Sequence, residues 1–209
     1  MKFNQITMRN ILVLFCIGIL LNDALTQGYN PQIDKKWDKV ISHIEAENWK
    51  EANILIKSLE RSLPDSSEYD EMKWRLRYMY IFSLAGLMNT NKLQKDEALN
   101  LTKIYLDSVL VVPGHPFTRQ RCSIGYFQTV EDNPKALYVG TGNRDGTLIF
   151  TTETFYFDED LETSFLDSIE GKFIDAMVKL KGIEFAGISF PRFLIEFQFL
   201  DCNIYNRKK

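Results

Sequence analysis

The side chains that could do chemistry are few in this chain and lie far apart. Its two histidines are His43, set among apolar residues at helical spacing, and His115, set between two prolines. The sequence has no G-x-S-x-G nucleophile elbow, no P-loop, no H-E-x-x-H helix and no paired C-x-x-C. We therefore predict no catalytic residue, no metal site and no cofactor.

Two further segments contain residue types that are found at ligand sites. The loop GTGNRDG, residues 140–146, has three glycines, but a phosphate cradle needs a helix directly behind it, and the TLIFTTETF that follows is typical of a strand. We interpret the loop as a hairpin turn. The acidic run of Asp158, Glu159, Asp160 and Glu162 does not have the spacing of a calcium loop, whereas carboxylates suit the first turn of a helix.

Composition limits the class of partner. The chain has 209 residues, 45% of them hydrophobic, which is ample for a packed core. Its formal net charge is −3, and its charges are spread evenly rather than held in basic blocks. A nucleic-acid backbone needs a concentrated positive surface, so we predict no nucleic-acid partner.

The N-terminus has the pattern of an export signal. Lys2 and Arg9 precede the apolar run ILVLFCIGILL, and small residues favour a cut before Gln27. The run is shorter than the roughly 20 apolar residues of a bilayer span. We predict that residues 1–26 are a signal peptide and that the exported chain, periplasmic or secreted, has no membrane span after cleavage.

Removal of the signal would leave two cysteines, Cys122 and Cys202. In an oxidising compartment they could pair, and the alternative is two buried free thiols. A disulfide would close a loop of roughly 80 residues (202 minus 122) and contribute about 4 kcal/mol through the unfolded state. We predict the disulfide, as a structural bond.

The first half of the exported chain has the helical period. From Pro31 to about Leu110 apolar residues recur at intervals of three and four. One stripe is made by Trp37, Val40, Ile41 and Ile44, and the next by Ala52, Leu55, Ile56 and Leu59. With YDEMKWRLRYMYIFSLAGLMN and DEALNLTKIYLDSVL, they predict antiparallel helical hairpins over a domain of residues 27–112.

The segment NWKEANILIKSLERSLP resembles the second half of a tetratricopeptide repeat. The residues that carry the resemblance are Trp49, Ala52, Ile56, Leu59 and Pro64. Including a weaker second copy from Gly86 to Tyr105, it extends over about residues 33–110; a plain four-helix bundle is the alternative. The resemblance implies a surface that binds peptides or partner proteins.

The second half has a period of two. The segment VVPGHPFT interrupts the helical pattern, and we predict a linker over residues 113–120 and a β domain over residues 121–209. Three strands, a helix and two more strands predict an α+β chain that ends in a five-stranded antiparallel sheet or barrel. This order of elements resembles that of an OB barrel.

The last strand, FPRFLIEFQFLDC, has two faces. We expect the face with Phe193, Ile195, Phe197 and Phe199 to be core, which leaves Glu196 and Gln198 on the other face.

The predicted function is an exported, non-catalytic binding or assembly module. We expect it to bind a protein or peptide through the helical hairpins and a groove between the two halves; a small-molecule ligand is left open. The candidate binding residues are Trp49, Tyr78, His115, Glu196 and Gln198. The alternative is an exported enzyme that uses carboxylates of the β domain as acid and base.

Overall fold

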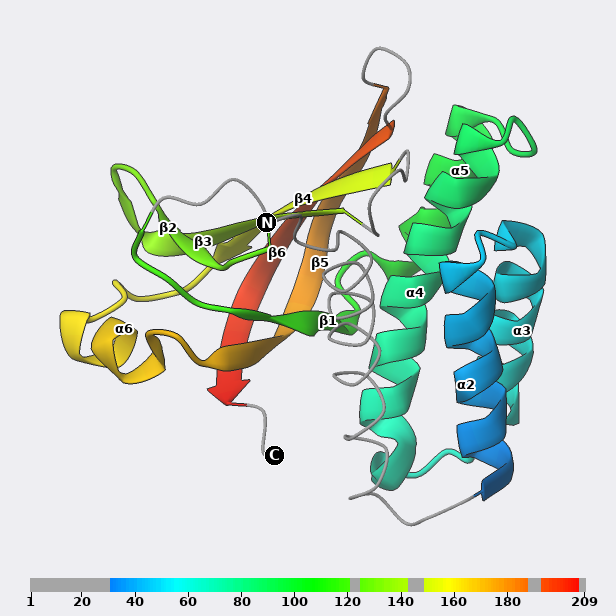
Figure 1. The fold of residues 1–209 in the computed structure, drawn as a ribbon, viewed down its shortest axis with the longest axis horizontal. Helices are drawn as coiled ribbons and strands as arrows, with labels where there is room; N and C mark the ends of the chain where they lie inside the picture. The colour runs from blue at the N-terminus through cyan, green and yellow to red at the C-terminus, as the bar shows by residue number, and fades with distance from the viewer. Residues whose placement is uncertain (1–30, 121–124, 143–148, 188–192, 207–209) are drawn as a thin grey trace, which may run out of the picture.

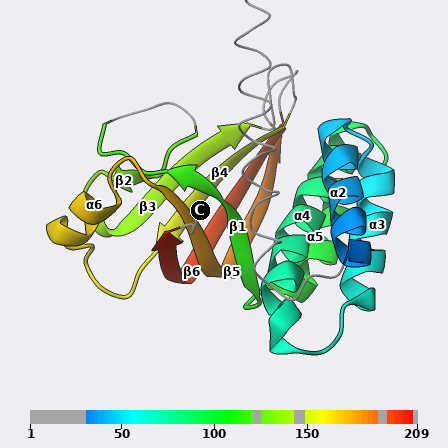
Figure 2. The same ribbon diagram turned by 60° about the horizontal axis from the view of Figure 1, so that its bottom comes forward.

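The computed structural model describes residues 31–120, 125–142, 149–187 and 193–206. These residues form a layer of helices beside one β-sheet (Figure 1). The predicted α+β class is confirmed. Figure 2 shows helices α2 to α5 gathered on one side of the molecule and α6 at the opposite end of the sheet.

Helices α2 (Pro31–Glu45) and α3 (Trp49–Ser62) are amphipathic, and each buries the stripe that the helical period predicts. Helix α4 (Asp70–Asn89) follows a short 3-10 turn (Ser67–Tyr69) and is buried along most of its length. It packs against α3 on one side and against β1 of the sheet on another, which explains why apolar residues surround it. It is therefore the central helix that joins the two layers.

The predicted fourth helix is shorter than expected. Helix α5 (Lys95–Thr102) is followed by a 3-10 turn (Lys103–Tyr105), and strand β1 (Val109–Pro116) then begins. Val109 and Leu110, which we predicted at the end of this helix, begin the run VLVV, which is rich in β-branched residues and belongs to the strand.

The sheet has the strand order β1-β5-β6-β4-β3-β2. The other strands are β2 (Gln128–Val130), β3 (Asn133–Gly142), β4 (Ile149–Tyr156), β5 (Phe173–Gly187) and β6 (Phe193–Asn206). Helix α6 (Thr163–Ile169) connects β4 to β5. Strands β4 and β6 pair in parallel, and the other neighbouring pairs are antiparallel.

This topology corrects the predicted five-stranded antiparallel barrel. In the described residues the sheet has six strands, contains a parallel pair and is not closed, so its arrangement is not OB-like. The missed strand is β1, whose last residues lie in the expected linker of residues 113–120. Its two prolines are tolerated because β1 is an edge strand with a bulge between Val112 and His115.

The predicted core face of β6 is confirmed where it is described. Ile195, Phe197 and Phe199 are buried; the side chain of Phe193 lies outside the described residues. Phe199 pairs with Leu180 of β5, whereas Phe197 and Ile195 pair with residues further along that strand. Strand β5 is 15 residues long and its pairing with β6 has two irregularities, which the period of two does not reveal.

Within the described ranges, none of the helices combines the length and the apolar character needed to cross a membrane.

Candidate functional site

Trp49, the first predicted binding residue, is a packing residue. It begins α3 and is only 3% exposed. Its indole packs directly on Gly86 of α4, where an added Cβ would overlap the ring, and it meets Phe82 edge to face at 5.9 Å between ring centroids. Trp49 therefore fixes the distance between α3 and α4 instead of facing a ligand.

Tyr78, the second predicted binding residue, joins α4 to the sheet. Its ring is buried and stacks on Phe197 of β6 at 5.6 Å between centroids. Its hydroxyl donates a hydrogen bond of 2.5 Å to Oε1 of Glu153 in β4. Burial, and then the nearby Glu153 carboxylate, raise the pKa of Tyr78 well above its ordinary value, so the phenol stays protonated and acts as a donor.

Glu153 is the most unusual ionisable residue of the described chain. It is 0% exposed and shares the inward face of β4 with Phe155. Burial raises its pKa to about 7, although the hydroxyls of Tyr78 and Thr151 favour the charged form and offset part of this effect. Thr151 lies on the same face two residues earlier, and its hydroxyl is buried beside the Glu153 carboxylate.

A carboxyl group with a pKa near 7 beside a protonated tyrosine has the chemistry of an acid–base pair. The pair is sealed between α4 and the sheet, however, and neither residue is exposed enough to meet a substrate. In this conformation its physical role is to connect the two layers, at the cost of burying a group that prefers to ionise in water.

A second polar contact joins the layers nearby. Nη2 of Arg75 in α4 lies 3.4 Å from Oδ2 of Asp175 in β5 and 2.6 Å from Oε1 of Glu71. Asp175 is 1% exposed, and Gly114 of β1 leaves room for it, since an added Cβ there would lie 2.5 Å from Oδ1. The guanidinium thus compensates a buried carboxylate.

His115, in β1, is partly buried and contacts Phe127 at 6.0 Å between ring centroids. Burial lowers its pKa to about 4, so the imidazole is neutral at physiological pH. His115 therefore belongs to a strand of the sheet, although we predicted it in a linker over residues 113–120.

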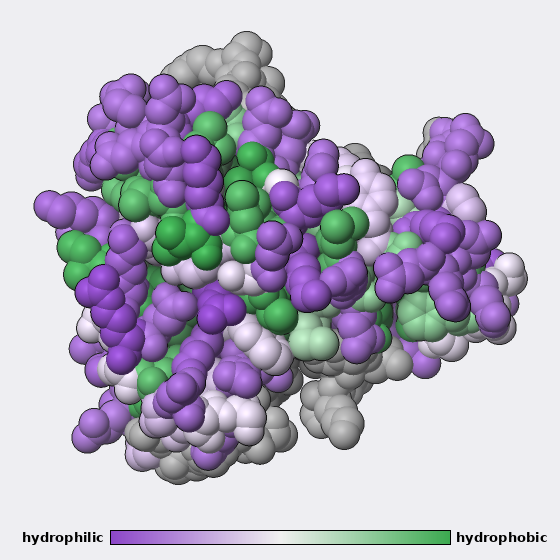
Figure 3. Space-filling model, turned by 180° about the vertical axis from the view of Figure 1, so that it is seen from behind, coloured by the Kyte–Doolittle hydropathy of each residue, from purple (hydrophilic) through white to green (hydrophobic). Residues whose placement is uncertain are grey.

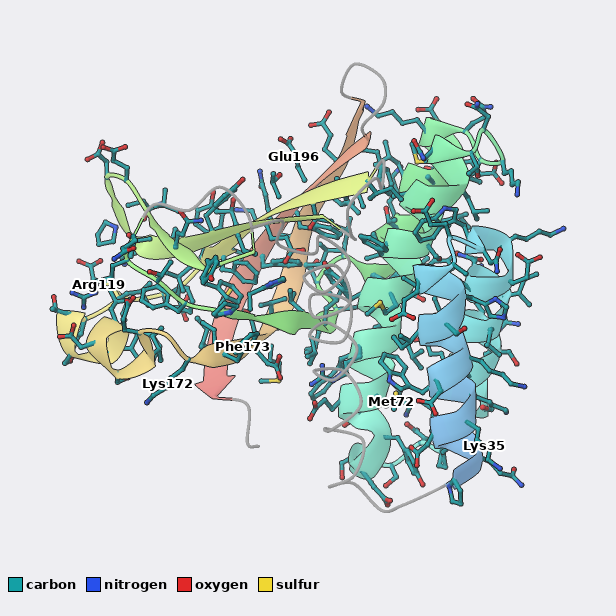
Figure 4. All side chains as sticks on the ribbon, in the orientation of Figure 1. Lys35, Met72, Arg119, Lys172, Phe173 and Glu196 are labelled. Atoms are coloured by element: carbon teal, nitrogen blue, oxygen red, sulfur yellow. The ribbon has the colours of Figure 1, made fainter. Side chains whose placement is uncertain are left out.

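Glu196, which is labelled in Figure 4, and Gln198 are exposed on the outer face of β6, as predicted. Glu196 lies opposite Glu184 of β5, and Gln198 lies opposite Gly182. The structure therefore does not bring the five predicted binding residues into one site: Trp49 is buried between α3 and α4, Tyr78 between α4 and the sheet, His115 is in the edge strand β1, and Glu196 and Gln198 face solvent on the sheet.

The remaining predicted sites are placed only in part. Cys202 is half-buried, and burial raises its pKa to about 12. Cys122 lies outside the described residues, so the disulfide stays a prediction. The acidic residues 158–160 precede α6 instead of forming its first turn, which corrects that expectation. Among the residues described, no group of three or more His, Cys, Asp and Glu side chains is placed to hold a metal ion.

Sequence reasoning missed an open groove of about 550 Å³ on the outer side of α3. The residues that line it are Asn53, Ile54, Lys57, Ser58, Arg61 and Ser62. Ile54 is 58% exposed, which is unusual for a large aliphatic side chain. The only sequence feature that indicates this groove is Ile54, a single isoleucine on the otherwise polar face of the amphipathic helix α3.

Contacts with α4 hold the groove in shape. Asn53 donates a 2.9 Å hydrogen bond from Nδ2 to Oγ of Ser83, and Nζ of Lys57 lies 4.6 Å from the centroid of the Tyr80 ring. Figure 3, seen from behind, shows hydrophobic residues gathered on the helical half and surrounded by hydrophilic ones. We define the α3 strip as the exposed Lys50, Ile54 and Arg61 together with the half-buried Lys57.

No protein-family model, no curated protein and no solved structure matches this chain.

Proposed function

We propose that this protein is a non-catalytic binding module whose helical layer recognises a protein or peptide partner. The observation that carries the proposal is the open groove on α3, where an exposed isoleucine lies between cationic side chains. A solvent-facing groove that combines an apolar centre with charged neighbours is typical of interaction surfaces.

The sheet supports this surface instead of forming it. Helix α4 is tied to the sheet through Tyr78 and Arg75, and α3 is fixed on α4 through Trp49. Each connection is buried, so the helix that lines the groove has a rigid base. A preorganised surface loses less conformational entropy when it binds.

The recognition surface lies on the outer side of the helices in this proposal, whereas the sequence predicted a groove at the junction of the two halves. At the junction, the polar side chains of Tyr78 and Glu153 are engaged with each other and buried. The segment of residues 49–64 resembles a tetratricopeptide unit, and helical hairpins of that type commonly bind peptides, which supports the proposal.

We also infer that the protein is exported, from the pattern of residues 1–26, which lie outside the described residues. The partner would then be another protein of the envelope or the medium. The alternative is an enzyme that uses carboxylates of the sheet, and Glu153, the sheet carboxyl group whose pKa is raised to about 7, is 0% exposed.

Site-specific photo-crosslinking in the producing cells tests the proposal. A photoreactive amino acid is placed in the full chain at Ser58 of α3, at Ser42 of α2, or at Asn203 of β6, all of which are exposed. We expect one protein to be crosslinked from a helical position and not from Asn203. If neither helical position yields a crosslinked protein above the Asn203 control, the proposed function is wrong.

A further inference from the structure

We propose that the α3 strip binds an acidic peptide segment of a partner protein, with Lys57 and Arg61 pairing with its carboxylates and Ile54 contacting an apolar side chain. This inference rests on the proposed function and adds the chemistry of the partner.

The spacing of the α3 strip suits a short peptide. Its members recur at intervals of three and four residues, so they lie along one side of the helix. From Lys50 to Arg61 the strip extends over roughly 16 Å, at 1.5 Å per residue. An extended segment of about five residues, or about three helical turns, covers this length.

The charge of the groove selects an acidic ligand. Its lining contains two cationic side chains and no carboxylate. Among the described residues, neither Lys50 nor Arg61 has a carboxylate at ion-pair distance, and Lys57 contacts only an aromatic ring as a cation. Three cations without counter-charges on one strip attract an acidic partner.

One carboxylate of the same helix, that of Glu60, is already engaged. Oε1 of Glu60 lies 3.4 Å from Nε of Arg77, and Oε2 accepts a hydrogen bond of 3.2 Å from the Tyr105 hydroxyl. Glu60 therefore points toward α4 and the turn after α5, away from the strip. It leaves Lys57 and Arg61 unpaired, and the exposed Glu51 lies beside Lys50 at the other end of the strip.

Other ligand classes fit this surface less well. A nucleic-acid groove needs exposed aromatic rings for stacking among its cations, and none lines this groove. A membrane-surface helix needs a broad apolar face, whereas here one exposed isoleucine lies among polar residues. An acidic segment with an apolar anchor matches both the charge and the single hydrophobic contact.

A second copy of the chain is the competing occupant. Its exposed acidic residues 158–160 lie at the α6 end of the sheet, opposite the helices (Figure 2). A contact between that end and the α3 strip would be head to tail and would build open chains of molecules unless it closed into a ring.

Fluorescence anisotropy with two synthetic peptides tests the inference on the full chain. Both peptides have about twelve residues and the same leucines, but one is rich in glutamate and the other in lysine. We compare the wild-type chain with the double variant Lys57→Glu/Arg61→Glu. The matched control is Lys35→Glu/Lys39→Glu, which changes the net charge equally on the exposed side of α2 (Figure 4 labels Lys35).

We expect the glutamate peptide to bind the wild type and the α2 variant within a factor of about two of each other. The α3 variant should bind at least about tenfold more weakly, because two attractive charges become repulsive, and binding should weaken as salt rises. Circular dichroism and unfolding curves establish that both variants remain folded.

Three results would overturn the inference: no binding of the glutamate peptide to the wild type, equal loss in both variants, or equal binding of the lysine peptide. Sedimentation that shows wild-type self-association, lost in the α3 variant, would assign the strip to a second copy instead. A protein crosslinked from Ser42 but not from Ser58 would leave the proposed function standing and refute the α3 strip as its site.

Discussion

The substitution Glu153→Gln tests whether the buried carboxyl group of β4 changes stability with pH. The pKa of Glu153 is raised from an ordinary value of 4.5 to about 7, chiefly by burial. Between these values the unfolded chain releases the proton and the folded chain keeps it. The free energy of unfolding of the wild type should therefore fall as pH rises from about 4.5 to 7 and then level off.

The size of the effect follows from the shift. About 2.5 pKa units (7 minus 4.5) correspond to roughly 3 kcal/mol, because one unit is worth about 1.4 kcal/mol. Glutamine cannot ionise. Its carbonyl oxygen can still accept the hydrogen bond from Tyr78, and its amide can donate to the nearby Thr151 hydroxyl.

Urea unfolding at pH 5 and pH 8, followed by the fluorescence of the tryptophans in the helices, measures the difference. We expect Glu153→Gln to unfold with a free energy up to roughly 3 kcal/mol above that of the wild type at pH 8, and with a much smaller advantage at pH 5. Glu184→Gln, at an exposed position of β5, is the control and should change little at either pH. A Glu153→Gln effect of the same size at both pH values would refute the reasoning.

Three further substitutions probe the contacts that hold the layers together. Tyr78→Phe should lower the free energy of unfolding by about 1 to 3 kcal/mol, because Glu153 loses its hydrogen-bond donor. The loss of stability with pH should also move to higher pH, since the hydrogen bond no longer favours the ionised carboxyl group. Urea unfolding between pH 5 and 9 measures both effects, and an unchanged pH profile would contradict the role of this hydrogen bond. A change from glycine to alanine usually stabilises a helix by up to about 1 kcal/mol. Here Gly86→Ala should destabilise the protein by about 1 to 3 kcal/mol, because the new Cβ would overlap the Trp49 ring, and thermal unfolding measures the sign of the change. Arg75→Met should cost about 3 kcal/mol or more because it removes the guanidinium that lies 3.4 Å from the buried carboxylate of Asp175. Lys179→Met, which removes an exposed ion pair of 2.7 Å, should cost far less, and equal costs in urea unfolding would show that burial is not the cause.

The helical layer was predictable because its signal is local. The stripes of α2 and α3 repeat within a few residues, and the tight contact of Trp49 lies within the pattern that the sequence analysis quoted. The inward face of β6 follows from alternation alone, since Ile195, Phe197 and Phe199 occupy every second position.

Strand β1 was missed because two of its signals conflict. Its β-branched start favours a strand, but the prolines and glycine that follow favour a break. Only the pairing with β5, some 60 residues later in the chain, resolves the conflict, since it places β1 at an edge where proline is tolerated. A short local window contains no information on that partner.

The polar contacts between the layers were missed for a related reason. Tyr78 and Glu153 are 75 positions apart, and a tyrosine in a helix or a glutamate in a strand is unremarkable by itself. One signal was present: strict alternation places Glu153 on the same face as Ile149 and Phe155, which are core residues. A carboxylate on an apolar face predicts either a partner or a raised pKa, and here the structure gives both.

The same connection leads to a final prediction, on the pH dependence of binding. Glu153, whose pKa burial raises to about 7, ionises between pH 5 and 8. If the groove depends on α4 being fixed to the sheet, the wild type should bind the glutamate peptide more weakly at pH 8 than at pH 5, by at most the roughly tenfold that about 1.4 kcal/mol represents. Glu153→Gln should bind equally at both values. If both proteins lose the same affinity between pH 5 and pH 8, the cause lies in the peptide or the groove. The ionisation of Glu153 would then have no effect on how α4 supports α3.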